Sequence, residues 1–312
     1  MILMKKTLTR INKEQGKSYL RLMSRHLAIG LHDGGSVVMQ TDVPEEAAAF
    51  DGLGRLLCLT VKDGAPENVA DATLTVPDAL PENRHVVRET PLTETAYTAD
   101  WGRLLVAGRK KASRRPDYCR SCVWQTLLIS AGLNAVLRGA DAVPVHSAVL
   151  ETDRGAVLIF GESGMGKSTA FRRWIACGGK GFSDDMALLD FSGDDGIHVR
   201  RLPTWSACRE GRNEWNYPAG EELPLAMVFA LGRSETGRDR IAELSAAQFF
   251  AQCYRSMFYW ILRYAAGLPD DLKARLTSCI RRQTEIIADR FPPRALMTSF
   301  EGDLKRFVED NL

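Results

Sequence analysis

The chain has 312 residues, a formal net charge of +2 and a hydrophobic content of 45%. These totals exclude a disordered or fibrous protein, and a nearly neutral chain lacks the overall field that would draw it to nucleic acid or to a membrane surface. We therefore expect neither partner. Cysteines are scattered and odd in number, and no apolar run follows the basic N-terminal residues, which predicts a cytoplasmic protein without a signal peptide.

Short apolar or alternating runs separated by Gly, Pro and Asp fill roughly the first hundred residues. They predict a β-rich region with one short helix within 43–57. A polar, basic and proline-containing stretch at 108–118 then indicates a boundary. We therefore divide the chain into a β-rich N-terminal region at 1–117, which could bind a peptide or serve as an accessory domain, and a second domain at 118–312.

The second domain begins with apolar positions at helical spacing, which run from Cys119 to a stop at Gly139. The next segments, 142–160 and 186–205, each consist of two strand-like runs joined by a tight turn. Such turns imply antiparallel pairing, so the expected fold class is α/β with a mixed, partly antiparallel sheet. A buried strand and two amphipathic helices are predicted further on, at 224–232, 245–267 and 271–290.

The sequence GESGMGKST at 161–169 fits the phosphate-binding pattern G-x-x-x-x-G-K-[ST]. It lies between a buried-strand pentad, AVLIF, and a helix-like run, AFRRWIACGG, which is the context that the pattern requires. Glycines let successive N–H groups face phosphate oxygens, while Lys167 would bind the terminal phosphates and Ser168 would bind Mg²⁺. The predicted nucleotide-binding residues are Gly161, Ser163, Gly164, Met165, Gly166, Lys167, Ser168 and Thr169.

Two adjacent aspartates, Asp184 and Asp185, follow Lys167 closely and precede an apolar strand. Because neighbouring side chains on an extended chain face opposite ways, one carboxylate can reach the Mg²⁺ held by Ser168 while the other faces an acceptor hydroxyl. The alternative is an acidic turn, since aspartate favours turns. The pair in SGDDG, at 194–195, fits that alternative.

The segments VHSAVLE, GAVLIFGESGMGKST and GGKGFSDDMALLD, within 140–192, resemble the core of the HPr kinase/phosphorylase family. The resemblance implies a carboxykinase-like P-loop fold that transfers phosphate from ATP, with Mg²⁺, to a serine hydroxyl of a protein. Within this family the layout and the PTW stretch at 203–205 are most similar to the kinase-like proteins of the SynChlorMet peptide-maturation cassette, which is encoded with small precursor peptides.

The resemblance also implies roles for single residues. Lys167 and Asp184 match catalytic positions of the family. Ser168 matches its Mg²⁺-binding residue, and Asp185 matches a residue close to the metal. His146 matches an active-site histidine, where an imidazole can support the charge of a transferring phosphoryl group. On its strand pattern alone it would more often be a structural histidine. Members of the family assemble from identical subunits, so a homo-oligomer is also implied.

The chain departs from the family after the second hairpin. The glycine-rich signature linked to phosphorolysis and HPr docking has no counterpart in 206–224, which puts both properties in doubt. We expect phosphotransfer to a serine or threonine hydroxyl of a peptide or small protein, such as a ribosomally made precursor peptide. The alternatives are an ATP-binding adaptor or sensor without transfer, and a kinase of a free metabolite such as serine.

Other candidates carry weaker patterns. Arg233 follows a predicted strand and is a candidate ligand of the γ-phosphate. The aromatic and arginine-rich segment 203–218 fits either peptide or base binding or simple packing of a loop. The remaining histidines lack a partner pattern and are assigned structural roles: His26, His32, His85 and His198.

Overall fold

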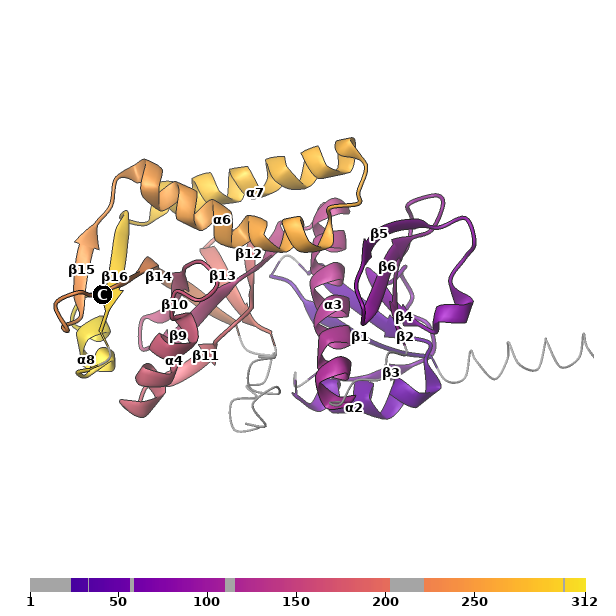
Figure 1. Cartoon of the computed structure of the whole chain (residues 1–312), viewed down its shortest axis with the longest axis horizontal. Coiled ribbons are helices and arrows are strands. Elements are labelled where there is room, and N and C mark those ends of the chain that lie inside the picture. The colour runs from indigo at the N-terminus through magenta and orange to yellow at the C-terminus, as the bar shows by residue number, and fades with distance from the viewer. Residues whose placement is uncertain (1–23, 33, 57–58, 110–115, 203–221, 300) are drawn as a thin grey trace, which may run out of the picture.

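The structure is a computed structural model that describes residues 24–32, 34–56, 59–109, 116–202, 222–299 and 301–312. Figure 1 shows two β-sheets with a long helix, α3 (Pro116–Leu137), standing between them. The chain is therefore a mixed α/β protein with a β-rich N-terminal region, as expected.

The first sheet lies in the N-terminal region and has the strand order β3-β1-β2-β4-β7-β6-β5. Its central strands β2, β4 and β7 pair in parallel, whereas the outer pairs are antiparallel. The expected short helix is present as α2, preceded by a 3₁₀ turn. The elements are β1 (Arg25–Gly30), β2 (Ser36–Thr41), η1 (Pro44–Glu46), α2 (Ala47–Leu56), β3 (Lys62–Asp63), β4 (Ala72–Thr75), η2 (Pro77–Ala79), β5 (His85–Glu89), β6 (Thr93–Tyr97) and β7 (Leu104–Gly108).

The second sheet has the order β11-β9-β10-β14-β13-β12-β8, with β16 pairing to β14 and β15. Both expected tight turns join antiparallel strands, β9 to β10 and β12 to β13, and β14 runs parallel to β10. The elements are β8 (Ala142–Val145), β9 (Ser147–Thr152), β10 (Gly155–Phe160), β11 (Lys180–Ser183), β12 (Ala187–Gly193), β13 (Gly196–Arg201), β14 (Glu222–Arg233), β15 (Arg240–Glu243) and β16 (Arg294–Thr298).

The structure corrects the sequence expectation at His146. A single strand was expected to lead into the first turn, but the chain divides there into β8, which pairs with β12, and β9, which pairs with β10 and β11. A second chain segment, from β11 to β12, runs antiparallel to this one: β11 pairs with β9, and β12 pairs with β8. The first segment is interrupted at His146 and the second at Asp184 and Asp185. The two interruptions therefore lie beside one another.

Helices cover both faces of the second sheet (Figure 1). On one face, α3 and α6 enclose a continuous apolar core that also includes the first sheet, with α7 packed alongside. On the other face, α4 and α8 enclose a smaller core. Their bounds are α4 (Lys167–Ala176), α6 (Ala246–Tyr264), α7 (Asp270–Arg290) and α8 (Leu304–Glu309).

Strand β10 shows why the second sheet takes this layered form. Its residues are fully buried, and alternate side chains enter opposite cores: Leu158 and Phe160 face the first core, whereas Val157 and Ile159 face the second. A strand buried on both faces reads as an unbroken apolar run, which is the AVLIF pattern. The first core runs through both sheets, so the packing does not separate the chain at residue 117. The division there rests on the sequence alone and stays a prediction.

Among the described residues, none of the helices combines the length and the apolar content that crossing a lipid bilayer requires.

Candidate functional site

The glycine loop lies between the end of β10 and the start of α4. Gly164 and Gly166 have φ angles of 86° and 104°, values in the left-handed region that side chains disfavour. Gly166 is also the residue that caps the N-terminus of α4. A helix N-terminus presents unpaired backbone N–H groups and a partial positive charge, which together favour an anion. The strand, loop and helix therefore have the arrangement that a phosphate-binding loop needs.

Lys167 is the first residue of α4 and its side chain is buried. Its Nζ donates hydrogen bonds to the carbonyl oxygens of Gly161, at 2.7 Å, and Glu162, at 3.1 Å. Burial lowers the pKa of the ammonium from 10.5 to about 8, and the nearby charge of Asp185 opposes part of that shift. The loop thus holds its lysine inward by backbone acceptors.

Asp184 and Asp185 follow β11 in a bend that leads into β12. The hydroxyl of Ser183 fixes this bend, because it donates to the carbonyl of Met186 and accepts from the Met186 N–H at 3.3 Å. Asp184 is 1% exposed, whereas the side chain of Asp185 is 22% exposed. Both residues line the cavity that Lys167 lines. The two acids thus have different surroundings, which is the condition for separate roles.

His146 faces Asp185 across the break in the sheet. Its Nε2 lies 3.4 Å from Oδ1 of Asp185, and the amide of Gln125, from α3, reaches the other carboxylate oxygen at 3.3 Å. The imidazole stacks on Tyr259 with ring centroids 4.5 Å apart and meets the ring of Trp260 at 5.5 Å. Helix α6 therefore fixes the plane of the histidine while α3 and the sheet fix its partner.

A cavity of about 740 Å³ joins these groups, a volume within the usual range of ligand sites. Most of the predicted site residues line it: His146, Ser163, Gly164, Gly166, Lys167, Ser168, Thr169, Asp184 and Asp185. Gly161 and Met165 are not among the described lining residues. Gly161 acts through its carbonyl, which holds Lys167, and Met165 is 42% exposed at the loop surface. The structure brings the predicted side chains together, and their chemical roles stay predictions.

A further wall of the cavity comes from residues that sequence patterns did not indicate. The turn between β5 and β6 contributes Thr90, Pro91 and Leu92, β6 contributes Thr93, and β5 contributes Arg88. The hydroxyl of Thr90 accepts hydrogen bonds from the N–H groups of Leu92 and Thr93 at 3.2 and 2.9 Å, which fixes the turn. The first sheet therefore supplies part of the site.

Two arginines bring positive charge to this wall. The Arg263 guanidinium donates to the Tyr259 hydroxyl at 2.5 Å, and that of Arg88 lies 4.1 Å from the centre of the Tyr264 ring. Arg233, the arginine that sequence reasoning offered for this purpose, ends β14 and is not among the described lining residues. A local motif could not have found Arg88 or Arg263, since no spacing links them to the loop.

One predicted candidate, the aromatic and arginine-rich segment with PTW, lies outside the described residues, within 203–221. Residues 110–115 of the basic boundary stretch also lie outside them. Arg109, the first of the basic run, is described and pairs with Glu89 at 2.5 Å and Glu94 at 2.9 Å. That residue therefore takes part in an ion-pair network on the first sheet.

The fold and the cavity define a mixed α/β protein with a glycine loop at a strand-to-helix junction, faced by paired aspartates and a histidine. The chain belongs to the family described as SynChlorMet cassette protein ScmC, which matches residues 123–310, well over half of the 312 residues. This match confirms the expected relationship to the SynChlorMet cassette. The kinase reaction is not tested by it.

Comparison with solved structures gives a distant likeness. A chain titled "Structure of the Hpr(Ser) kinase/phosphatase from Coxiella burnetii" is 17% identical, with coverage of 32% of this chain and 77% of that chain and a TM-score of 0.24. A likeness at this TM-score does not establish a shared fold. None of the curated proteins compared with the chain matches it.

Proposed function

We propose that the protein transfers a phosphoryl group from ATP to a serine or threonine hydroxyl of a peptide or small protein, with Mg²⁺ as cofactor. One observation carries the proposal: Lys167 and Ser168 of the glycine loop line the same cavity as Asp184 and Asp185. Phosphoryl transfer requires both sets of groups around one phosphorus atom. Membership of the SynChlorMet cassette family, together with the resemblance to kinase-like proteins encoded with small precursor peptides, favours a ribosomally made precursor peptide as the acceptor.

The donor set fits a magnesium-bound nucleotide. The hydroxyl of Ser168 and the carboxylate of Asp185 are hard oxygen ligands of the kind that Mg²⁺ prefers. When bound, the ion would neutralise phosphate charge. The backbone N–H groups at the start of α4 would hold phosphate oxygens, and Lys167 would exchange its bonds to Gly161 and Glu162 for bonds to the terminal phosphates.

The acceptor hydroxyl would enter between the loop and the wall that Thr90 and Arg263 line. Asp184 would orient this hydroxyl and take its proton as the oxygen attacks the γ-phosphorus. The new bond joins the acceptor oxygen to phosphorus, and the bond from phosphorus to the bridging oxygen of ADP breaks. Arg88 and Arg263 would stabilise the negative charge on the transferring group, as arginines do in other phosphotransferases.

The proposal is tested with the full chain, Mg²⁺ and γ-labelled ATP, offered either a library of serine- and threonine-containing peptides or free serine. We expect label on peptide, and we expect Asp184→Asn to lower turnover by about 10²–10⁴-fold while ATP affinity is retained. Asp153→Asn, in the exposed turn between β9 and β10, is the matched control and should keep full turnover.

Three outcomes contradict the proposal, each in a different way. ATP hydrolysis without label on any peptide would show that the protein does not transfer phosphate to a peptide hydroxyl. Label on free serine alone indicates a metabolite kinase. ATP binding with no turnover, unchanged in Asp184→Asn, indicates a nucleotide-binding adaptor.

A further inference from the structure

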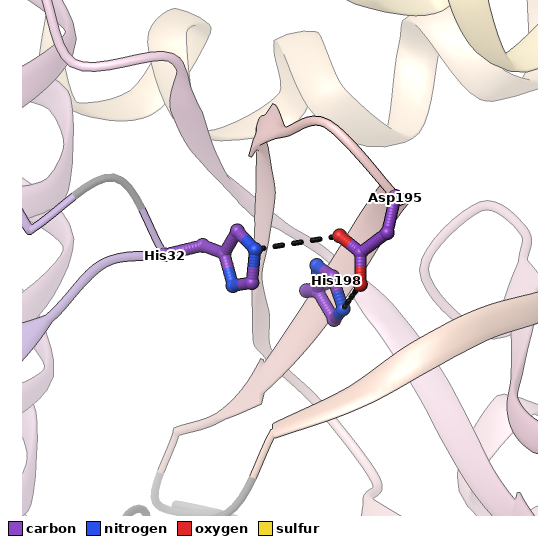
Figure 2. A group of neighbouring side chains, drawn as sticks. All are labelled: His32, Asp195 and His198. Carbon is purple, nitrogen blue, oxygen red and sulfur yellow. Dashed lines mark ion pairs between the residues drawn. The ribbon is translucent and has the colours of Figure 1, made fainter.

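A second group of side chains capable of holding a metal lies away from the cavity. His32 stands in the turn between β1 and β2, whereas Asp195 and His198 belong to the turn after β12 and to β13. Figure 2 shows the three side chains converging between the first and second sheets. Sequence reasoning treated both histidines as structural and the aspartate as an ordinary turn residue, and the structure brings them together.

We propose that His32, Asp195 and His198 bind a divalent cation of the zinc type, independently of the Mg²⁺ expected at the glycine loop. One ligand atom from each residue lies within 4.8 Å of the other two. Oδ1 of Asp195 is 3.3 Å from Nε2 of His32, and Oδ2 is 3.6 Å from Nε2 of His198. Ligands bound at about 2.0–2.2 Å around a tetrahedral ion lie roughly 3.3–3.6 Å from one another.

The chemistry of the donors selects the ion. Two imidazole nitrogens and one carboxylate oxygen suit Zn²⁺ and related transition metals, whereas Mg²⁺ prefers oxygen ligands alone. The two imidazole rings lie side by side, with centroids 4.4 Å apart and an angle of 20° between their planes, and Nε2 of each ring lies beside one oxygen of the Asp195 carboxylate. Three protein ligands leave one position for water, as in open zinc sites.

Neighbouring groups support the first ligand. The backbone N–H of His32 donates to Oδ2 of Asp190 at 2.7 Å, which fixes its turn. On the other side of the ring, Nδ1 lies 3.6 Å from a carboxylate oxygen of Glu222. A carboxylate in that position receives the second ring N–H of a metal-bound histidine and orients it. Glu222 is in turn paired with Arg200.

The charge and the access also suit a cation. Asp190, Asp195 and Glu222 surround the histidines. Arg200 is paired with Glu222 and lies 3.8 Å from Asp190, and the guanidinium of Arg290 lies against Gly196. The side chains of His32 and Asp195 are 32% and 67% exposed, so an ion can enter from solvent. His198 is buried, with an Nδ1 atom that has no hydrogen-bond partner among the described residues. A bound ion would fasten the first sheet to the β12–β13 hairpin and so stabilise the folded chain.

The test uses the full chain after chelator treatment, titrated with Co²⁺ and then competed with Zn²⁺. We expect visible absorption of Co²⁺ bound to nitrogen ligands, its loss on addition of one equivalent of Zn²⁺, and a rise in the unfolding temperature with Zn²⁺ that a large excess of Mg²⁺ does not reproduce. His32→Ala, at an exposed position, should weaken Co²⁺ binding by more than about 100-fold, and Glu222→Gln by about 10-fold.

The matched control is His85→Ala, which removes a histidine that stacks on Trp101 in the first sheet. It should bind Co²⁺ and Zn²⁺ as the unaltered chain does. The proposal would be overturned if His32→Ala bound Co²⁺ as tightly as the unaltered chain does. It would also be overturned if the unaltered chain bound Zn²⁺ no more tightly than His32→Ala does. None of these measurements uses phosphoryl transfer, so their outcome is independent of the proposed function.

Discussion

The imidazole of His146 and the carboxylate of Asp185 face one another at 3.4 Å because two antiparallel chain segments are interrupted at the same level of the second sheet. One segment passes from β8 to β9 through His146, and the other passes from β11 to β12 through the aspartate pair. Side chains at such breaks leave the regular alternation of the strands. The pair can therefore turn toward the glycine loop.

The first prediction concerns this contact and rests on the proposed function. His146→Asn removes the imidazole beside Asp185 and should lower turnover by about 10²-fold, because a charge-supporting partner of the reacting groups is lost. ATP affinity should change little, since the loop is intact. Turnover and the dissociation constant of ATP are measured separately, with His85→Asn as the control. A loss of ATP affinity equal to the loss of turnover would show that His146 only maintains the loop.

The second prediction concerns the pH dependence of nucleotide binding. Burial lowers the pKa of Lys167 to about 8 in the free protein, so the ammonium form that binds phosphate is present below this pH and is lost above it. ATP affinity should fall by about tenfold between about pH 7 and about pH 9. Isothermal titration at both values measures this fall.

The same experiment with Lys167→Arg is the control, because arginine stays charged over this range. Its affinity, although weaker, should hold constant with pH. An equal fall in both proteins would assign the pH dependence to another group.

The third prediction concerns the attachment of α4, the helix that follows the glycine loop. Arg173, on α4, donates to both carboxylate oxygens of Asp239 at 3.0 and 2.8 Å and to the carbonyl of Ser299 at 2.7 Å. Both side chains of the ion pair are largely buried, at 12% and 6% exposure. Arg173→Ala leaves the acid uncompensated and should lower the free energy of unfolding by about 3–5 kcal/mol.

Urea unfolding measures this change. Arg154→Ala, in the exposed β9–β10 turn, is the control and should stay within about 0.5 kcal/mol of the unaltered chain. Pairing Arg173→Met with Asp239→Leu should recover part of the loss, because it removes the orphaned charge. A loss below about 1 kcal/mol in Arg173→Ala would show that the pair is screened by water.

The fourth prediction concerns the contact between the end of α6 and the first sheet. Gly267 donates its N–H to the carbonyl of Val87 at 3.0 Å, and a Cβ added to Gly267 would come within 2.5 Å of that carbonyl oxygen. Backbone cannot move aside as a flexible side chain can. Gly267→Ala should therefore cost about 1–3 kcal/mol in the free energy of unfolding.

Gly30→Ala is the matched control, since an added Cβ there meets nothing within 4 Å. It should leave stability nearly unchanged. Thermal unfolding of the two variants provides the comparison, and an equal effect in both would remove the steric explanation.

The sequence predicts the elements of this site better than its assembly. The glycine loop could be predicted because its strand, turn and helix are adjacent in the chain, so local chemistry decides their geometry. Both tight turns and the helices α3, α6 and α7 follow from local periodicity in the same way. Contact between His146 and Asp185 could be expected only through resemblance, since it depends on how distant strands pair.

Strand β6 shows why other parts escaped prediction. Its sequence, TETAY, lacks an apolar alternation, yet every residue is buried. The charge of Glu94 is tolerated there because Arg84 donates to it at 2.5 Å and Arg109 at 2.9 Å. These partners lie on other segments and lower the pKa of Glu94, with the bond from Arg84 as the largest cause and burial acting against it. A sequence pattern contains the polar residues of the strand but not the partners that neutralise them in the fold.

The tight turn between β5 and β6 forms one part of the cavity lining, while the glycine loop forms another. The two segments are far apart in the sequence, and the phosphate-binding pattern constrains the residues of the glycine loop but not those of the turn. If the proposed reaction is correct, substitutions in the segment from Thr90 to Thr93 can change which acceptor the protein binds, while the residues that bind the triphosphate stay the same.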